Sequence, residues 1–160
     1  MHIEAKLHAL GLALPPPLPL PPGVTLPFPW VRVQGRRVFV SGHGPQDDDG
    51  TLAGPFGQVG AAVSLEQAQG LARKVALSML ASLQRELGDL DRIGAWLRVF
   101  GMVNSAPGFV RQPLVINGFS ELILDVYGAE RGAHARSAVG MAALPFDIAV
   151  EIEAEVEIDG

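Results

Sequence analysis

The sequence predicts an α/β (α+β) domain in which a single mixed sheet carries two helices on one face. The segment 150–158 alternates apolar residues with glutamates, which is the period of a strand with one buried face. Two longer segments, 64–87 and 113–127, repeat apolar residues every three or four positions, as amphipathic helices do. Strand-like segments precede, separate and follow these helices, so crossover connections and some parallel pairing are expected.

Two β-branched segments near the start of this pattern, 31–33 and 37–41, flank the pair 35–36 and predict a hairpin. The glycine-rich segment 42–60 is expected to be a loop. Within it, the three adjacent aspartates at 47–49 could be interpreted as metal ligands. Calcium loops, however, space their ligands at alternate positions and end in a distant glutamate, so we interpret the aspartates as a solvated turn.

The helix boundaries follow from capping residues. Ser64 is expected to begin the first helix, because Gln67 stands three residues later, at the spacing of a capping box. Gly88 follows the last apolar position and is expected to end that helix. The second helix, 113–127, is expected to stop at Gly128. Both apolar faces are interpreted as core.

Strand-like segments at 93–103 and 136–141 complete the expected order β-β-α-β-α-β-β. The segment 93–103 is apolar on both faces apart from Arg98, which is typical of a strand buried on both faces. With both helices on one face, nothing remains to cover the other, toward which Trp96, Phe100 or their neighbours would point. We therefore expect that face to contact another subunit.

The 160 residues fit one domain, 1–160, in which 1–30 form a proline-rich N-terminal arm. Most of the 13 prolines lie between positions 15 and 29, which excludes a helix or an inner strand there. The interspersed leucines favour an extended arm packed on the domain surface. A recognition motif for a proline-binding module is the alternative.

Composition excludes several function classes. The net charge is −5 and Lys6 and Lys74 are the sole lysines, whereas a nucleic-acid partner would require a basic face. The absence of cysteine excludes disulfides, a thiol nucleophile and thiolate metal sites. No apolar run reaches membrane-spanning length and no secretion signal is recognisable, so a cytoplasmic location is expected. Phosphate-loop, nucleophile-elbow and zinc-protease motifs are missing, and we expect neither a cofactor nor a metal.

Arg136 is the most informative cation. It follows a glycine-containing loop at the start of a strand and is flanked by small residues. A guanidinium in this position could form a bidentate pair with the carboxylate of a ligand. A structural ion pair with a glutamate of the last strand is the alternative. His43 and His134 stand at strand–loop borders, where they could reach a cleft or simply form hydrogen bonds.

The four glutamates at alternate positions from 151 to 157 would repel one another unless arginines face them across neighbouring strands. Candidate neighbours are Arg32, Arg37 and Arg98. A single glutamate placed over a pocket could orient a water molecule. The pattern alone does not identify which glutamate this would be.

Five segments resemble the RidA/YjgF family of reactive enamine/imine deaminases, also described as endoribonuclease L-PSP type. They are 38–42 (Val-Phe-Val-Ser-Gly), the helix 64–87, 99–103, 115–117 and 135–154. The Ala-Arg-Ser sequence at 135–137, followed by Leu-Pro and the glutamate strand, is the most specific of them. Together they extend from about Trp30 to the end of the chain. The resemblance implies a chorismate-mutase-like fold and a homotrimer with three clefts, each between two subunits.

The resemblance also implies roles for individual residues. Arg136 matches the arginine that binds the substrate carboxylate, and Glu151 matches the glutamate that positions the hydrolytic water. Ser41 and Asn117 match a serine after the second strand and a helix asparagine, and would line the cleft.

Other positions depart from the family pattern and point to a divergent subgroup. Trp30 stands where the family usually has tyrosine, and His43 where it has glutamine; both are expected near the substrate. Ala138 replaces a frequent cysteine.

The implied function is hydrolysis of small 2-enamine and 2-imino acids to 2-oxo acids and ammonia. A trimer that binds a small carboxylate without catalysis is the alternative. Endoribonuclease activity is a third hypothesis, which the acidic composition disfavours.

Overall fold

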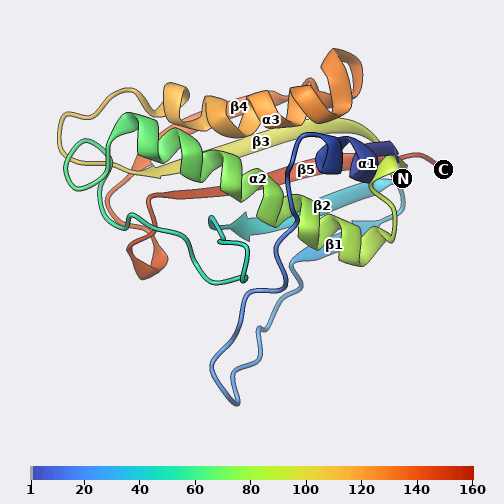
Figure 1. Ribbon diagram of the computed structural model, residues 1–160, viewed down its shortest axis with the longest axis horizontal. Coiled ribbons are helices and arrows are strands. Elements are labelled where there is room, and N and C mark those ends of the chain that lie inside the picture. The colour runs from blue at the N-terminus through green and yellow to red at the C-terminus, as the bar shows by residue number, and fades with distance from the viewer. Residues whose placement is uncertain (1) are drawn as a thin grey trace.

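In the computed structural model, which describes residues 2–160, five strands form one mixed sheet (Figure 1). They are β1 (Val31–Gln34), β2 (Arg37–His43), β3 (Ile93–Asn104), β4 (Ala135–Met141) and β5 (Val150–Ile158). Their order across the sheet is β1-β2-β5-β3-β4. Strands β3 and β4 are parallel, and all other neighbouring pairs are antiparallel. The predicted order β-β-α-β-α-β-β is confirmed.

Helices α2 (Leu65–Leu87) and α3 (Gln112–Gly132) lie side by side on one face of the sheet, as predicted (Figure 1). The prediction of two helices was incomplete, because a short helix α1 (His2–Ala9) precedes them. It buries Ile3 and Leu7 and contacts α3 and the short 3-10 helix η1 (Leu90–Arg92). No helix within residues 2–160 combines the length and apolar character needed to cross a membrane.

The capping and turn residues act largely as expected. Ser64 and Gln67 form a capping box, with the Ser64 hydroxyl accepting from the Gln67 amide at 3.1 Å and the Gln67 side chain accepting from the Ser64 amide at 2.9 Å. Gly35 takes the positive φ of 62° at the first position of the two-residue hairpin turn. Gly128 leaves the helical conformation with φ 77° and ψ 171°, so the predicted stop is confirmed there, and one further helical turn follows after this kink.

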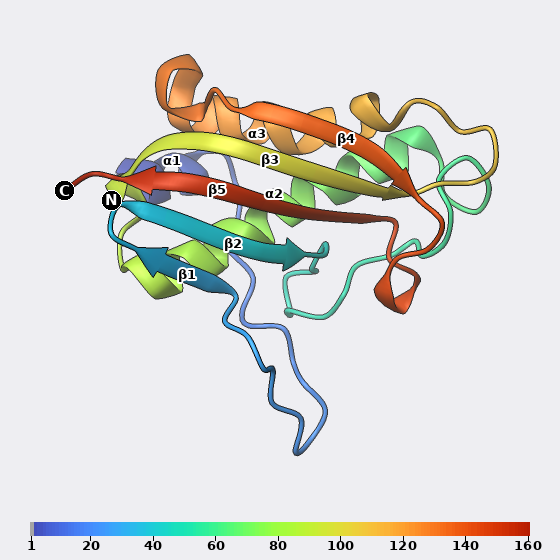
Figure 2. The same cartoon turned by 180° about the vertical axis from the view of Figure 1, so that it is seen from behind.

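The two faces of the sheet differ in character. The apolar residues of β5 point toward the helices and are at most 5% exposed, whereas its glutamates occupy the opposite face. That open face carries no helix (Figure 2). Arg37 pairs there with Glu155 at 2.7 Å, as the sequence suggested. Trp96 points toward the helices and contacts Phe119 and Tyr127, so the alternative that Phe100 lies on the open face is the correct one.

The proline-rich segment runs from α1 into a long loop that extends beyond β1 and then returns to enter β1 (Figures 1 and 2). Its backbone is fixed at both ends. The carbonyls of Pro15 and Pro16 accept from Arg85 at 3.3 Å and from Gln46 at 3.2 Å. At the other end, the Pro29 carbonyl accepts from the Ser41 hydroxyl at 2.9 Å.

The acidic turn of 47–49 is locally satisfied. The carboxylate of Asp49 accepts from both the amide and the hydroxyl of Thr51, and Asp47 pairs with Lys74 on α2. Two of the three carboxylates therefore stabilise the turn and its contact with the helix.

His43 connects β2 to α2 from inside the core and is 4% exposed. Its Nδ1 lies 2.6 Å from the Ser41 carbonyl and therefore carries the proton, while Nε2 accepts from the Ser82 hydroxyl at 2.8 Å. The Trp30 ring lies against it, with centroids 5.0 Å apart. Burial lowers the pKa of His43 to about 4, against the opposing effect of its bond to Ser41.

Replacing Gly118 should destabilise the contact between the helices. A Cβ at this position would lie far inside van der Waals contact with the Gln69 carbonyl oxygen of α2. We expect Gly118→Ala to lower the free energy of unfolding by about 1–3 kcal/mol in urea denaturation. Gly70→Ala is the matched control, because Gly70 follows Gln69 on α2 but is exposed and has open space at its Cβ. A stability change of equal size in both variants would contradict the close approach.

Acid should destabilise the fold through His43. Between pH 6.5 and about 4 the unfolded chain binds a proton that folded His43 does not, so stability falls as the pH falls. The fully developed difference is about 3 kcal/mol. We expect His43→Asn, which keeps a donor for the Ser41 carbonyl, to lose this part of the pH dependence when unfolding is measured at both pH values. Parallel pH profiles for the two proteins would refute the assignment.

Candidate functional site

Arg136 lies on the edge strand β4 and points toward the helical layer. Its backbone is in register with Val99, whose side chain is buried under the helices. The guanidinium donates to the Asn117 side chain at 2.9 Å, to the Ser120 hydroxyl at 3.1 Å and to the Pro113 carbonyl at 3.2 Å. All three acceptors are neutral, so none of them cancels the charge.

The alternative role of Arg136, an ion pair with a glutamate of the last strand, is not realised within the part of the chain that the structure describes. Within residues 2–160 no carboxylate forms an ion pair with this guanidinium. The glutamates of β5 face the other side of the sheet, where Glu155 pairs with Arg37 and Glu157 pairs with Arg36 at 2.9 Å. Arg136 therefore remains available to an anionic ligand.

A hydrogen-bond chain behind Arg136 fixes its position. The Ser120 hydroxyl accepts from Arg136 and donates to Nε2 of His134 at 2.9 Å. The Nδ1 of His134 lies 2.7 Å from the Gly132 carbonyl and therefore carries the proton. Burial lowers the pKa of His134, and the charge of Arg136 lowers it further, whereas the bond to Gly132 opposes both. A neutral His134 is the form that this chain requires.

Sequence analysis did not identify Ser120. It stands three residues after Asn117, on the same side of α3, and both are polar positions beside an apolar helix face. That spacing is the one local indication of its role. Ser120, His134 and Arg136 border a shallow cavity of about 320 Å³ at the β4 edge.

Glu151 lies on the opposite face of the sheet from Arg136. It is in register with Met102 of β3, which is in register with Val139 of β4. Val139 is three residues from Arg136, and because side chains alternate along a strand, the two point to opposite faces of the sheet. The Glu151 carboxylate lies close to Gly42, where a Cβ would come within 3.0 Å of Oε2. Burial raises the pKa of Glu151, and the neighbouring charge of Glu153 raises it further.

Of the other residues expected at the site, Trp30, Ser41 and His43 lie on or beside β2. Trp30 and Glu151 border the same groove, of about 570 Å³, between the sheet and the proline-rich loop. Ser41 borders a separate cavity of about 190 Å³ on the open face, and its hydroxyl is bonded to the Pro29 carbonyl. His43 lies behind Trp30 with both ring nitrogens hydrogen-bonded inside the protein, so neither is left for a ligand.

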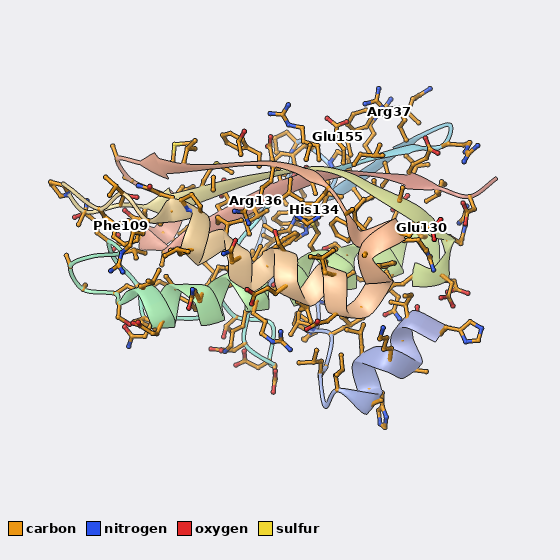
Figure 3. The ribbon with its side chains drawn as sticks, turned by 90° about the horizontal axis from the view of Figure 1, so that it is seen from above. Arg37, Phe109, Glu130, His134, Arg136 and Glu155 are labelled. Atoms are coloured by element: carbon orange, nitrogen blue, oxygen red, sulfur yellow. The ribbon has the colours of Figure 1, made fainter. Side chains whose placement is uncertain are left out.

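The expected site residues thus form two groups. Arg136 and Asn117 lie together at the β4 edge, whereas Trp30, Ser41 and Glu151 lie around β2 and β5. Figure 3 shows Arg136 and His134 between the sheet and α3, while Arg37 and Glu155 project from the opposite face. One chain therefore presents the expected site residues as two groups on opposite faces of its sheet.

Comparison with known proteins finds a similar sequence and several solved structures with the same fold. No family model matches the sequence. Protein TCP17 of Trypanosoma cruzi is 41% identical over 157 residues, which span 98% of this chain and 94% of that protein. The crystal structure of Atu1372 from Agrobacterium tumefaciens, a protein of unknown function, is 42% identical and has a TM-score of 0.86, covering 99% of this chain and 92% of that chain.

A putative endoribonuclease from Shewanella oneidensis MR-1 is 27% identical with a TM-score of 0.85, covering 98% of this chain and 99% of that chain. The Rid family protein YyfA from Yersinia pestis shares the fold at 19% identity and a TM-score of 0.59, over 86% of this chain and 92% of that chain. The architecture is the chorismate-mutase-like fold that the resemblance implied. The comparisons therefore support the resemblance to the RidA/YjgF (L-PSP) family, and the chain shares the fold of these proteins over most of its length.

Proposed function

We propose that the protein hydrolyses small 2-imino acids, or their 2-enamine tautomers, to 2-oxo acids and ammonia in a cleft between two copies of the chain. The observation that supports this most directly is that the Arg136 guanidinium is positioned by hydrogen bonds but carries an uncompensated charge. It is held in place by neutral acceptors, without an ion-pair partner in residues 2–160, at the edge of a shallow cavity. A carboxylate ligand would supply the missing charge.

In the proposed reaction, Arg136 binds the substrate carboxylate and so places the imine carbon. Water adds to that carbon while Glu151 accepts one of its protons. Glu151 returns this proton to the nitrogen, and its carboxylate then transfers the proton of the added hydroxyl as the C=O bond forms and the C–N bond breaks, so the nitrogen leaves as ammonia. The raised pKa of Glu151 suits a group that both accepts and returns a proton.

The chemistry demands positioning more than activation, because imines hydrolyse readily. The hydrogen bonds from Asn117 and Ser120 restrict the guanidinium before a ligand arrives. In this reaction Glu151 carries out the proton transfers and Arg136 binds the carboxylate, so the proposal calls for neither a metal nor a cofactor.

The proposed assembly is a homotrimer. Arg136 and Glu151 face opposite sides of one sheet, so a cleft that uses both must take one from each of two subunits. The open face also exposes Phe39, of which 38% is accessible, and carries Phe100 beside it. Aromatic side chains on an uncovered sheet favour burial against another copy.

A ribonuclease function, which the name of the Shewanella oneidensis relative suggests, is less well supported. The open face carries the glutamates of β5, and the net charge is −5. A phosphate backbone would be repelled by this surface. We therefore favour a small carboxylate as the ligand.

Loss of the guanidinium should abolish most of the activity. With 2-aminoacrylate or 2-iminobutanoate generated in situ by a dehydratase, we expect Arg136→Ala to lower kcat/KM by about a hundredfold or more, and Arg136→Lys to restore part of it. Lys6→Ala, which removes an exposed cation on α1 away from the open face, serves as the control and should match the wild type. Unchanged turnover by Arg136→Ala would exclude the proposed carboxylate site.

Two inactive variants should complement each other. Arg136→Ala and Glu151→Gln are each expected to be inactive alone, because every cleft then lacks one group. When they are unfolded together and refolded as a mixture, about a quarter of the clefts in random trimers receive both native groups. Ammonia release by the mixture, but not by either variant refolded alone, is the expected result. An inactive mixture of folded, assembled protein would contradict a cleft shared between subunits.

A further inference from the structure

The groove beside Glu151 is unusually apolar for a site that handles a charged substrate. It encloses about 570 Å³, within the range of small-molecule sites. One wall consists of the proline-rich loop, including Leu20, Val24 and Phe28, and Phe146 closes another side. Glu151 is the single ionisable residue among those that line it.

The loop wall is anchored at its two ends, by backbone hydrogen bonds and by the packing of Leu14 and Trp30 against the core. Its first end is fixed by hydrogen bonds to the carbonyls of Pro15 and Pro16, and its second by the bond from Ser41 to the Pro29 carbonyl. Between these ends, Leu20, Val24 and Phe28 are each more than 40% exposed, and the Phe28 ring packs edge-on against Trp30 with centroids 5.9 Å apart.

The backbone of Phe146, at the groove, adopts a conformation that is energetically unfavourable for a residue with a side chain. It adopts a left-handed φ of 57°, which an aromatic residue rarely takes without compensation. The compensation comes from its neighbours: Asn104 donates to the Asp147 carboxylate at 3.1 Å and to the Ile148 carbonyl at 3.2 Å, and the Gly57 amide donates to the Asp147 carbonyl at 2.8 Å. The ring itself stays 80% exposed, so it contributes little to the core.

We infer that this groove binds the apolar side chain of the substrate, and that the protein selects 2-imino acids with branched aliphatic or aromatic side chains. The inference rests on the proposed function, because it places the imine carbon at Glu151. Around Glu151 the groove offers apolar surface that a side chain on that carbon could contact. Each methylene buried on this surface improves affinity by about fourfold, so larger side chains gain most.

Binding can be measured without any turnover. The probes are phenylpyruvate, 4-methyl-2-oxopentanoate and pyruvate, which are stable 2-oxo acids with aromatic, branched and minimal side chains. Calorimetry or thermal shift on the full chain should show both larger acids binding at least about tenfold more tightly than pyruvate. Equal affinity for the three acids, or no binding of any of them, would overturn the inference.

Variants in the two walls test where the preference arises. Phe146→Ala and Val24→Ser should each remove most of the preference for phenylpyruvate and leave the affinity for pyruvate unchanged. Both side chains are exposed, so the variants are expected to fold. Val110→Ala is the control, because Val110 is 78% exposed and does not line the groove. A preference that survives both wall substitutions would assign the selectivity elsewhere.

Kinetics then separate this inference from the proposed function. Imino acids of phenylalanine and leucine are generated by an amino-acid oxidase, and 2-aminoacrylate by a dehydratase. Higher kcat/KM for the larger imino acids, lost in Phe146→Ala, supports both statements. Turnover of 2-aminoacrylate with no advantage for larger substrates overturns the inference alone. Absence of all turnover refutes the proposed function, and the binding series still decides the inference.

Discussion

Strand β5 occupies the centre of the sheet, and the alternation of its side chains fixes the rest of the molecule. Its apolar residues meet the helical layer, while β2 and β3 pair with its two edges. A shift of one residue in either pairing would bury the glutamates and expose the core, so the register is strongly specified. The position of Glu151 on the open face is a direct result of this constraint.

The same alternation separates the two charged groups of the candidate site. Arg136 must face α3, because its neighbour in register on β3 is a core valine. Glu151 must face the other way, because it alternates with the core residues of β5. No rearrangement of side chains within one sheet can bring such groups together, and catalysis that uses both depends on association. Assembly and activity are then coupled by mass action.

Local chemistry determined which parts of the structure could be predicted. The strand 150–158 and the capping box of Ser64 depend on residues a few positions apart, and both were predicted correctly. Helix α1 was missed because its eight residues contain little apolar periodicity, and it is stabilised by contacts with distant elements. The hydrogen-bond chain from Arg136 through Ser120 to His134 joins α3 to β4 across space, so no spacing along the chain could indicate all of it. The groove likewise depends on how the loop and Phe146 meet, which the sequence pattern does not contain.

The anchoring of the proline-rich loop has an evolutionary consequence. Because backbone carbonyls make the anchoring bonds, the residues between them are free to change in number and kind with little effect on the fold. The entropic cost of a longer loop grows only slowly with its length. Insertions, deletions and substitutions within this segment would reshape the groove while the sheet and Arg136 stay in place. The loop thus resembles an exchangeable cover, through which related chains with the same reactive groups could diversify in the molecules they accept.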